Sequence, residues 1–191
     1  MNSNDLEKSF EFILELEKLK NIQRKVKPLG LERYENSAEH SWQVMFLALV
    51  LAGFSDEKIN IDKVLKMLLV HEIGEIDADD TFFFDDAARA DAKEKELEAV
   101  KRICKILPDK MGTEILEIWR EFEFGDSAEA KYARAIDRTM PVLQNIYNNR
   151  QSWDENGIGK EQVLSKTAYI GNASETVWNE LAKKIEQVFE L

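Results

Sequence analysis

Apolar residues recur at helical spacing along most of the chain. Leu6, Phe10, Ile13 and Leu14 form the first such series, which predicts a helix that ends near Asn21. Later series predict helices over residues 36–53, 62–74, 86–107, 111–123, 126–150, 159–170 and 174–189. No segment has the pattern of a confident strand. Because each helix has an apolar stripe that must be covered, the pattern predicts an all-α, single-domain helical bundle.

Polar residues mark several helix starts. Asn36, with Glu39 three residues later, fits a capping box at the start of the second helix. Asp62 and Asp126 are expected to cap two later helices. The segment 76–86 is acidic and aromatic and has no helical period, so we expect a loop there.

The composition suits one soluble domain. The chain has 191 residues, 44% hydrophobic and 33% charged, and its 3 prolines and 8 glycines leave room for long helices. At a net charge of −11, neither nucleic acid nor an anionic membrane is an expected partner. The longest apolar run, residues 44–52, is too short to cross a bilayer and the start resembles no signal peptide, so we expect a cytoplasmic location. Cys104 is the only cysteine, which excludes an intrachain disulfide.

The only two histidines lie on the apolar faces of predicted helices. His40 precedes Val44 by one turn, and His71 shares its face with Val64 and Leu68. Both imidazoles are therefore expected to point toward the core. Two unrelated buried histidines, each with its own hydrogen bond, would explain either one alone.

Acidic residues follow His71 closely. Glu75 lies one turn further on the same helical face, whereas Glu72 is expected to be rotated about 100° away. Asp80 belongs to an acidic cluster that repels itself unless a cation or water screens it. A solvated helix end would explain Glu72 alone, and a divalent cation would explain the whole cluster.

Asp137 lies in a strongly helical segment. It shares a face with Ala130 and Met140, where an unpaired carboxylate would be costly. Pro141, four residues on, cannot donate the helical hydrogen bond to the Asp137 carbonyl, so we expect a kink there. A core ion pair with a residue such as Arg134 is the alternative to a functional role.

Two imidazoles and one or two carboxylates from three helices suit a borderline divalent metal ion. Such a set leaves positions for water and for a substrate oxygen, which indicates metal-assisted hydrolysis. The chain contains no P-loop and no GxGxxG motif, and no serine or cysteine constellation competes as a nucleophile.

Three segments resemble the signature blocks of the HD-domain metal-dependent phosphohydrolases: NSAEHSWQV, LKMLLVHEIGEIDADDTFFFD and ARAIDRTMPVLQN. The similarity runs from near residue 16 to Trp178 and is greatest to the branch that includes bacterial 5′-deoxynucleotidases. It implies a single HD domain over residues 1–191, with its core at about 16–178. It also implies a homodimer that hydrolyses a small phosphomonoester, with a (deoxy)nucleoside 5′-monophosphate as the expected substrate.

The resemblance also implies roles for individual residues. One divalent ion (Mn, Co, Mg, Zn, Ni or Fe) would be held by four side chains: His40, His71, Glu72 and Asp137. Glu75 and Asp80 would be catalytic, through water activation and contact with the substrate. Arg24, in the basic segment before the first block, would hold the phosphate.

Two positions depart from the family pattern. Glu72 stands where the family has the aspartate of its His-Asp pair, and the extra methylene adds roughly 1.3–1.5 Å of reach. Asp79 stands where relatives usually have glycine, which adopts backbone angles that aspartate tolerates less well. Glu72 supports a second hypothesis, a non-catalytic metal- or nucleotide-binding protein with weakened activity. A helical interaction protein without metal is the third.

Three large apolar residues occur near the end of the chain. Trp153, Trp178 and Phe189 are expected to be exposed on the last helices. Exposed apolar residues of this size favour a protein interface, so these helices are where we expect the homodimer to form.

Overall fold

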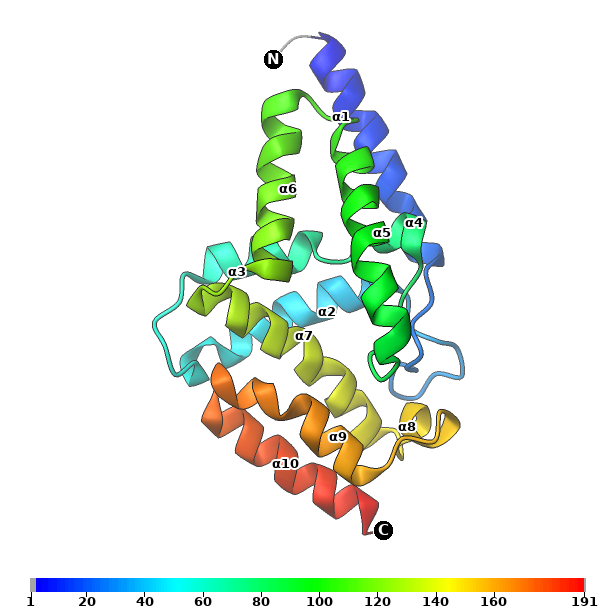
Figure 1. Cartoon of the computed structure of the whole chain (residues 1–191), viewed down its shortest axis with the longest axis vertical. Coiled ribbons are helices and arrows are strands. Elements are labelled where there is room, and N and C mark those ends of the chain that lie inside the picture. The colour runs from blue at the N-terminus through cyan, green and yellow to red at the C-terminus, as the bar shows by residue number, and fades with distance from the viewer. Residues whose placement is uncertain (1–2, 191) are drawn as a thin grey trace.

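The computed structural model describes residues 3–190, except for the side chain of residue 90, and shows an all-helical molecule (Figure 1). Its α-helices are α1 (Ser3–Leu16), α2 (Ser37–Leu51), α3 (Ile61–Val70), α4 (Glu75–Ala78), α5 (Asp86–Cys104), α6 (Asp109–Phe124), α7 (Ala128–Tyr147), α8 (Gln151–Glu155), α9 (Lys160–Thr167) and α10 (Glu175–Phe189). Short 3-10 helices follow α1, α2 and α9: η1 (Glu17–Asn21), η2 (Ala52–Phe54) and η3 (Ala168–Asn172). No strand forms in the described part of the chain, where Gln23 and Asn36 make an isolated antiparallel bridge. The predicted all-α fold is confirmed.

Three helices form the centre of the molecule. α2, α3 and α7 pack against one another in pairs. Figure 1 shows α1, α5 and α6 on one side of this centre, and α9 and α10 on the other. The packing brings together residues that are far apart in sequence, such as His40 and Asp137, which are 97 positions apart.

Buried apolar residues form two clusters. The larger lies among α2, α3, α7, α9 and α10 and includes Val44 and Leu68. The smaller joins α1, α5 and α6 through residues such as Phe12 and Trp119, and it also includes Val70 at the end of α3. The end of α3 therefore lies at the junction of the two clusters, and the chain that follows it is held from both sides.

Helix ends differ in detail from the sequence prediction. Asp62 and Asp126 were wrong as capping residues, because Asn60 and Ser127 accept the backbone hydrogen bonds at the starts of α3 and α7. A capping residue has an extended backbone conformation, just outside the helix. Asn60 and Ser127 both have this conformation. The first helix changes to 3-10 geometry after Leu16.

The apolar series that predicted the first helix is not its buried face. Leu6, Phe10, Ile13 and Leu14 are 55–68% exposed, whereas Phe12 is the buried residue of α1. These four side chains lie on one stripe, because their spacing follows the helical repeat. The helical period correctly predicted that this segment is a helix, but the apolar stripe faces outward instead of toward the core.

α2 is apolar on two faces. Val44 on the inner face is fully buried, whereas Trp42, Phe46 and Val50 are 54–72% exposed on the outer face. The exposed residues again follow the helical repeat and form a stripe. Within the described residues, α1 and α2 each therefore present an uncovered apolar stripe.

The aromatic residues near the C-terminus lie in the core instead of on the surface. Trp153 is 2% exposed and stacks on Phe189, with ring centroids 5.6 Å apart. Trp178 is partly buried against the larger cluster. The expectation that these residues are exposed was wrong, because α10 packs onto α7 and α9 and its apolar side chains complete that cluster.

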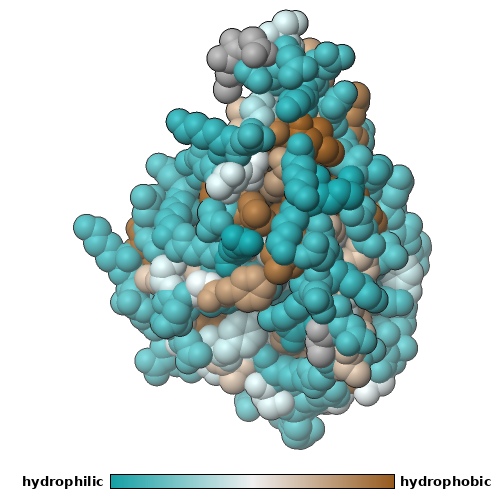
Figure 2. Space-filling model, turned by 45° about the horizontal axis from the view of Figure 1, so that its top comes forward, coloured by the Kyte–Doolittle hydropathy of each residue, from teal (hydrophilic) through white to brown (hydrophobic). Residues whose placement is uncertain are grey.

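Polar residues predominate on the face seen in Figure 2, where apolar residues appear in separate small areas. This surface is consistent with a chain in which 33% of the residues are charged. Among residues 3–190, no helix is both long and apolar enough to cross a membrane.

Candidate functional site

The first histidine is directed inward by the start of α2. Asn36 accepts a hydrogen bond from the backbone N–H of Glu39, whose carboxylate accepts one from the N–H of Asn36, so the predicted capping box is confirmed. This double cap fixes where α2 begins, and therefore which of its residues face the core. His40 lies on the same inner face as Val44 and is fully buried.

The helix that carries His71 ends earlier than its apolar pattern predicts. α3 stops at Val70, and residues 71–74 form a turn. The His71 carbonyl accepts a hydrogen bond from Trp119 Nε1 (3.1 Å). The turn brings Glu72 Oε1 to 3.2 Å from His71 Nε2, so these adjacent side chains meet even though successive helical positions are rotated by about 100°.

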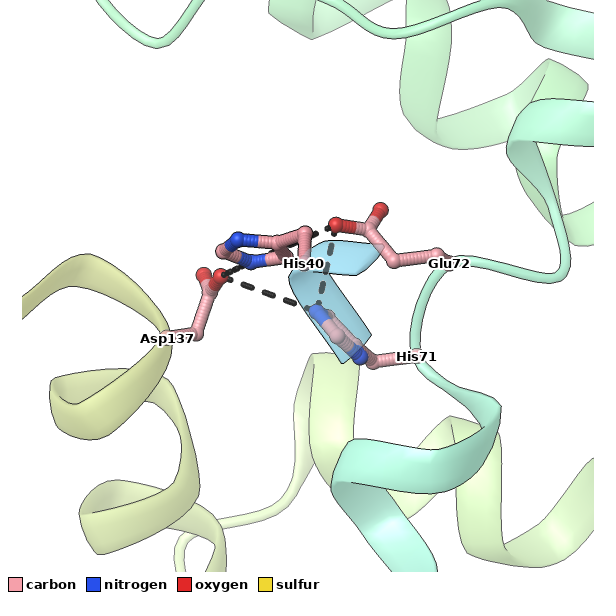
Figure 3. Close-up of side chains that lie close together, drawn as sticks. All are labelled: His40, His71, Glu72 and Asp137. Carbon is pink, nitrogen blue, oxygen red and sulfur yellow. Dashed lines mark hydrogen bonds and ion pairs between the residues drawn. The ribbon is translucent and has the colours of Figure 1, made fainter. Parts of the chain in front are cut away.

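Four side chains from three parts of the fold converge on one point (Figure 3). His40 Nε2 lies 2.8 Å from Asp137 Oδ1 and 3.6 Å from Glu72 Oε1. His71 Nε2 lies 3.6 Å from the same Asp137 oxygen. One ligand atom from each of the four residues lies within 4.8 Å of the other three. The structure therefore brings together all four residues of the expected metal-binding set.

The four donors fit a divalent metal ion. Two ligand atoms at about 2.1 Å from one metal lie about 3.0–3.4 Å apart. The four nitrogen–oxygen separations in the cluster run from 2.8 to 3.6 Å, and all four ligand atoms lie within 4.8 Å of one another. His71 Nδ1 lies 2.9 Å from the Leu68 carbonyl, so a proton on Nδ1 leaves Nε2 free as a ligand. Nε2 is buried and has no hydrogen-bond partner in the described structure. A cation would supply that missing partner.

Negative charge dominates the cluster. Burial opposes a charged imidazole, but the carboxylates of Glu72 and Asp137 outweigh it and raise the pKa of His71 to about 10. Burial likewise opposes the charge of Asp137, yet the hydrogen bond with His40 and the nearby His71 ring hold its pKa well below the usual value. Arg24 and His71 outweigh burial in the same way and lower the pKa of Glu72. Both carboxylates are therefore ionised at neutral pH and attract a cation.

Glu75 and Asp80 lie beside the cluster as protonatable groups. Glu75 accepts a hydrogen bond from Ser37 Oγ (2.6 Å). Burial, with added repulsion from Glu72, raises the pKa of Glu75 well above its usual value. Burial also raises the pKa of Asp80, although the charge of Arg24 opposes it. Carboxyl groups with raised pKa values can take up and release protons near neutral pH.

Arg24 is surrounded by carboxylates. Its Nη1 contacts Glu72 directly and lies 3.5 Å from Asp80 and 3.9 Å from Glu75. Its Nε lies 3.5 Å from Glu35 Oε2. The backbone N–H of Arg24 also donates to the Glu35 carbonyl (2.9 Å), which fixes the two residues side by side. Arg24 therefore lies at the site, with its charge shared among four carboxylates.

Glu35 is a buried acidic residue that sequence reasoning missed. Its Oε2 lies 3.3 Å from His40 Nδ1, and its Oε1 accepts a hydrogen bond from Gln144 Nε2 (2.6 Å). A carboxylate behind a ligating imidazole fixes which ring nitrogen carries the proton and which is free to bind. Glu35 lies in a segment without helical period, so only its place just before the Asn36 cap could have pointed to it.

A pocket opens beside the cluster. His71, Glu72 and Asp137 line it on the side of the metal donors, and Phe83 from the acidic, aromatic loop lines it as well. Its lining also includes six further charged side chains: Arg89, Lys93, Glu96, Glu123, Arg134 and Arg138. The loop expected over 76–86 is shorter in the structure, because its start belongs to α4 and α5 begins at Asp86, and its aromatic part lines this pocket.

The cation beside Asp137 is not the one that the sequence suggested. Arg134 donates to the backbone carbonyls of Phe122 and Gly125. Arg138 instead lies near Asp137, with Nη2 3.6 Å from Oδ2. Arg138 was missed because it immediately follows Asp137, and adjacent residues of a helix point in different directions.

Comparisons with known proteins identify the family and the fold of this chain. The family model described as HD domain matches residues 16–178. The crystal structure of a predicted metal-dependent phosphohydrolase from Magnetospirillum magnetotacticum MS-1 superposes with a TM-score of 0.92 and 33% identity, covering 98% of this chain and 94% of that chain.

Curated relatives are more distant. Human 5′-deoxynucleotidase HDDC2 is 30% identical over 115 residues, which are 60% of this chain and 55% of the human protein. The 5′-deoxynucleotidase HDDC2 of Dictyostelium discoideum is 26% identical over 163 residues, 82% of this chain and 85% of that protein. The chain therefore spans about half the length of the human relative that it matches.

Proposed function

The chain belongs to the HD domain family, as its three sequence blocks predicted, and we propose that it is a metal-dependent phosphohydrolase that releases phosphate from a (deoxy)nucleoside 5′-monophosphate. The observation that carries the proposal is the convergence of two imidazoles and two carboxylates beside a pocket. The 5′-deoxynucleotidases among its relatives support a nucleoside phosphomonoester as the substrate class.

The metal ion would be held by four residues: His40, His71, Glu72 and Asp137. When bound, a divalent cation lowers the pKa of a water ligand and polarises a phosphoryl oxygen. The mixed nitrogen and oxygen donors suit Mn²⁺, Co²⁺, Ni²⁺, Zn²⁺ or Fe²⁺ better than Mg²⁺, which prefers oxygen alone.

We assign to Glu75 the role of accepting the proton of the attacking water. It lies beside the cluster, burial raises its pKa well above the usual value so that it can hold a proton, and the hydrogen bond from Ser37 orients its carboxyl. Asp80, whose pKa is also raised, would contact the substrate and hold a proton for the leaving oxygen. Arg24 links both acids to Glu72 and would contact the phosphate from that side.

Phosphate release from a panel of nucleoside 5′-monophosphates tests the proposal. The purified protein is assayed with Mn²⁺, Co²⁺, Ni²⁺ or Mg²⁺, and 3′-monophosphates serve as the substrate control. We expect turnover of at least one 5′-monophosphate and a fall in kcat of about 100-fold or more in the Glu75→Gln variant, which keeps its metal. Folded protein that releases no phosphate with any of these metals contradicts the proposal.

We also propose a homodimer formed through the apolar stripes of α1 and α2. Phe10 and Leu14 on α1, and Phe46 and Val50 on α2, are each at least 54% exposed. Uncovered apolar stripes of this kind mark protein interfaces in soluble proteins, and a second copy of the same chain is the simplest occupant.

A further inference from the structure

Phosphate binding at this site requires more positive charge than Arg24 supplies. A phosphomonoester is an anion, and it would enter a pocket that Glu72, Glu75 and Asp80 already make acidic. These three carboxylates, together with Glu35, surround the Arg24 guanidinium. An arginine whose charge is shared among so many carboxylates offers little attraction to an additional anion.

Most other cations at the pocket are also engaged. Arg134 is bound to two backbone carbonyls. Lys93 lies 4.0 Å from Glu123, which neutralises its charge locally. These contacts leave Lys25, whose side chain is exposed, and two arginines of the pocket, Arg89 and Arg138.

Arg138 is the one that lies next to the metal donors. Its Nη2 is 3.6 Å from Asp137 Oδ2, and this is its only ion pair within the described part of the chain. The other oxygen of Asp137, Oδ1, faces His40 and His71. Asp137 therefore contacts the histidines through one oxygen and the Arg138 guanidinium through the other. A phosphate bound at the metal-binding point would lie beside this carboxylate and near Arg138.

The guanidinium is held in place by an aromatic ring, and the Tyr169 side chain engages only part of its set of N–H donors. Its central carbon lies 3.6 Å from the centroid of the Phe83 ring, which is 8% exposed. A stacked guanidinium keeps its N–H edges free for bidentate contact with an oxyanion. The Nε of Arg138 is buried and has no hydrogen-bond partner in the described residues.

Arg89 resembles Arg138 but has no contact with the metal donors in the described residues. Its guanidinium also lies over Phe83, at 4.8 Å from the ring centroid, and it lines the same pocket. No contact between Arg89 and any of the four metal donors is recorded in the structure of residues 3–190. Arg89 is thus a matched control, because it has the same charge and the same aromatic neighbour.

We propose that Arg138, stacked on Phe83 and adjacent to Asp137, binds the phosphate group of the substrate through its free N–H donors. This inference rests on the proposed function, because it assigns the residue that holds the phosphate in that reaction. It places the phosphate between the metal ligands and the Phe83 wall, with the rest of the substrate directed into the pocket.

Binding of inorganic phosphate, the product of the proposed reaction, tests this assignment separately from turnover. Isothermal titration calorimetry of the Mn²⁺-saturated protein gives the phosphate Kd, and elemental analysis gives the metal content of each variant. We expect Arg138→Gln to weaken phosphate binding by about 10- to 100-fold, as expected for a lost charge-assisted hydrogen bond. Arg138→Lys keeps the charge but loses the paired N–H donors of the guanidinium. Its phosphate Kd should lie between those of Arg138→Gln and the unchanged protein.

The control variant and the metal content decide between the alternatives. Arg89→Gln should change the phosphate Kd by less than about threefold, since no ion pair within residues 3–190 joins that residue to the metal donors. If the Arg138→Gln variant loses its metal, Arg138 serves to position the metal ligand Asp137, and the proposal is overturned. It is equally overturned if unaltered protein binds no phosphate, or if Arg89→Gln has the larger effect.

The two proposals fail in distinguishable ways. If the unaltered protein binds phosphate through Arg138 but hydrolyses no nucleotide, the assignment of Arg138 stands and the proposed function is wrong. If it hydrolyses nucleotides and Arg138→Gln has the same phosphate Kd and KM, the function stands and the assignment of Arg138 is wrong.

Discussion

Glu72 is one of the two positions expected from the sequence to depart from the family pattern, and its length has a role in the structure. Its Oε1 lies 3.2 Å from His71 Nε2 and 3.6 Å from His40 Nε2, and it also contacts Arg24. One carboxylate therefore joins the metal-binding cluster to the arginine that closes its other side. A shorter side chain cannot keep all of these contacts from the same backbone position.

Glu72→Asp tests whether the longer side chain belongs to a working site. The variant should bind Mn²⁺ about tenfold more weakly, the equivalent of ~1.4 kcal/mol, because its carboxylate withdraws from His71 and Arg24. Calorimetry measures the affinity, and phosphate release measures the activity. If activity appears only in Glu72→Asp, the natural protein is the non-catalytic metal-binding protein of the second hypothesis.

Glu96 provides a second test at the residue scale. Burial, with repulsion from Glu123, raises the pKa of Glu96 from 4.5 to about 7. A carboxyl whose pKa is raised by folding stabilises the fold while it is protonated, so this contribution is lost as the pH rises from 4.5 through about 7. Replacing it with the neutral, similarly sized glutamine should remove that loss.

Glu96→Gln should therefore increase the free energy of unfolding above pH 7 by about 1–3 kcal/mol and leave it nearly unchanged at pH 4. Urea unfolding at both pH values measures the effect. The control variant Glu94→Gln, on the exposed side of α5, should show no such pH dependence. Equal stabilisation of Glu96→Gln at both pH values contradicts a raised pKa.

Among the structural elements, the short segments between helices shape the site most. The helical faces of α2 and α7 were sufficient to predict that His40 and Asp137 point inward. Glu72 could not be placed from the sequence, because α3 ends where Trp119, from the distant α6, binds the His71 carbonyl. Glu35 could not be placed either, since its position depends on pairing with the backbone of Arg24. Periodicity records local faces, whereas these contacts are tertiary.

The loop after α4 contains a strained residue. Asp79 has φ 60° and ψ 163°, a combination that is essentially restricted to glycine. The resemblance of the sequence to the HD-domain family implies glycine at this position. The loop therefore adopts a glycine-type conformation in spite of the aspartate, immediately before Asp80.

Asp79→Gly should relieve this strain and raise the free energy of unfolding by about 1 kcal/mol, after allowance for the greater freedom of glycine in the unfolded chain. Thermal unfolding measures the change. Asp79→Ala, which keeps a Cβ atom, is the matched control and should bring no such gain. If the glycine and alanine variants have the same stability, the backbone at residue 79 is not strained.

The whole molecule places its site at the junction of two hydrophobic clusters. One cluster holds α2 and α7, which carry His40 and Asp137, and the other holds α5 and α6, which border the pocket. The overall bundle could be predicted from helical periodicity, because each helix needs a covered stripe. Periodicity could not predict that the apolar stripes of α1 and α2 face outward. Apolar residues that face a partner have the same period as those that face the core.

The oligomeric state tests the outward stripes. Sedimentation velocity at micromolar concentration should show a dimer, and Phe46→Asp on α2 or Phe10→Asp on α1 should shift it toward monomer. A carboxylate buried in an apolar interface loses hydration that nothing there replaces. Tyr147→Asp, at an exposed site on α7, is the control and should remain dimeric. An unaltered protein that is monomeric, or a dimer that resists both stripe variants, contradicts this interface.

Metal binding itself tests the account most directly. Metal-free protein titrated with Mn²⁺ should bind one equivalent per chain, because the four donors define a single point. The affinity should fall by about 100-fold or more in His71→Ala, which removes a ligand from the cluster, and should be unchanged in the surface variant Asp86→Ala. Absence of Mn²⁺ binding, or equal affinity in His71→Ala and the unaltered protein, would contradict a metal site at His40, His71, Glu72 and Asp137.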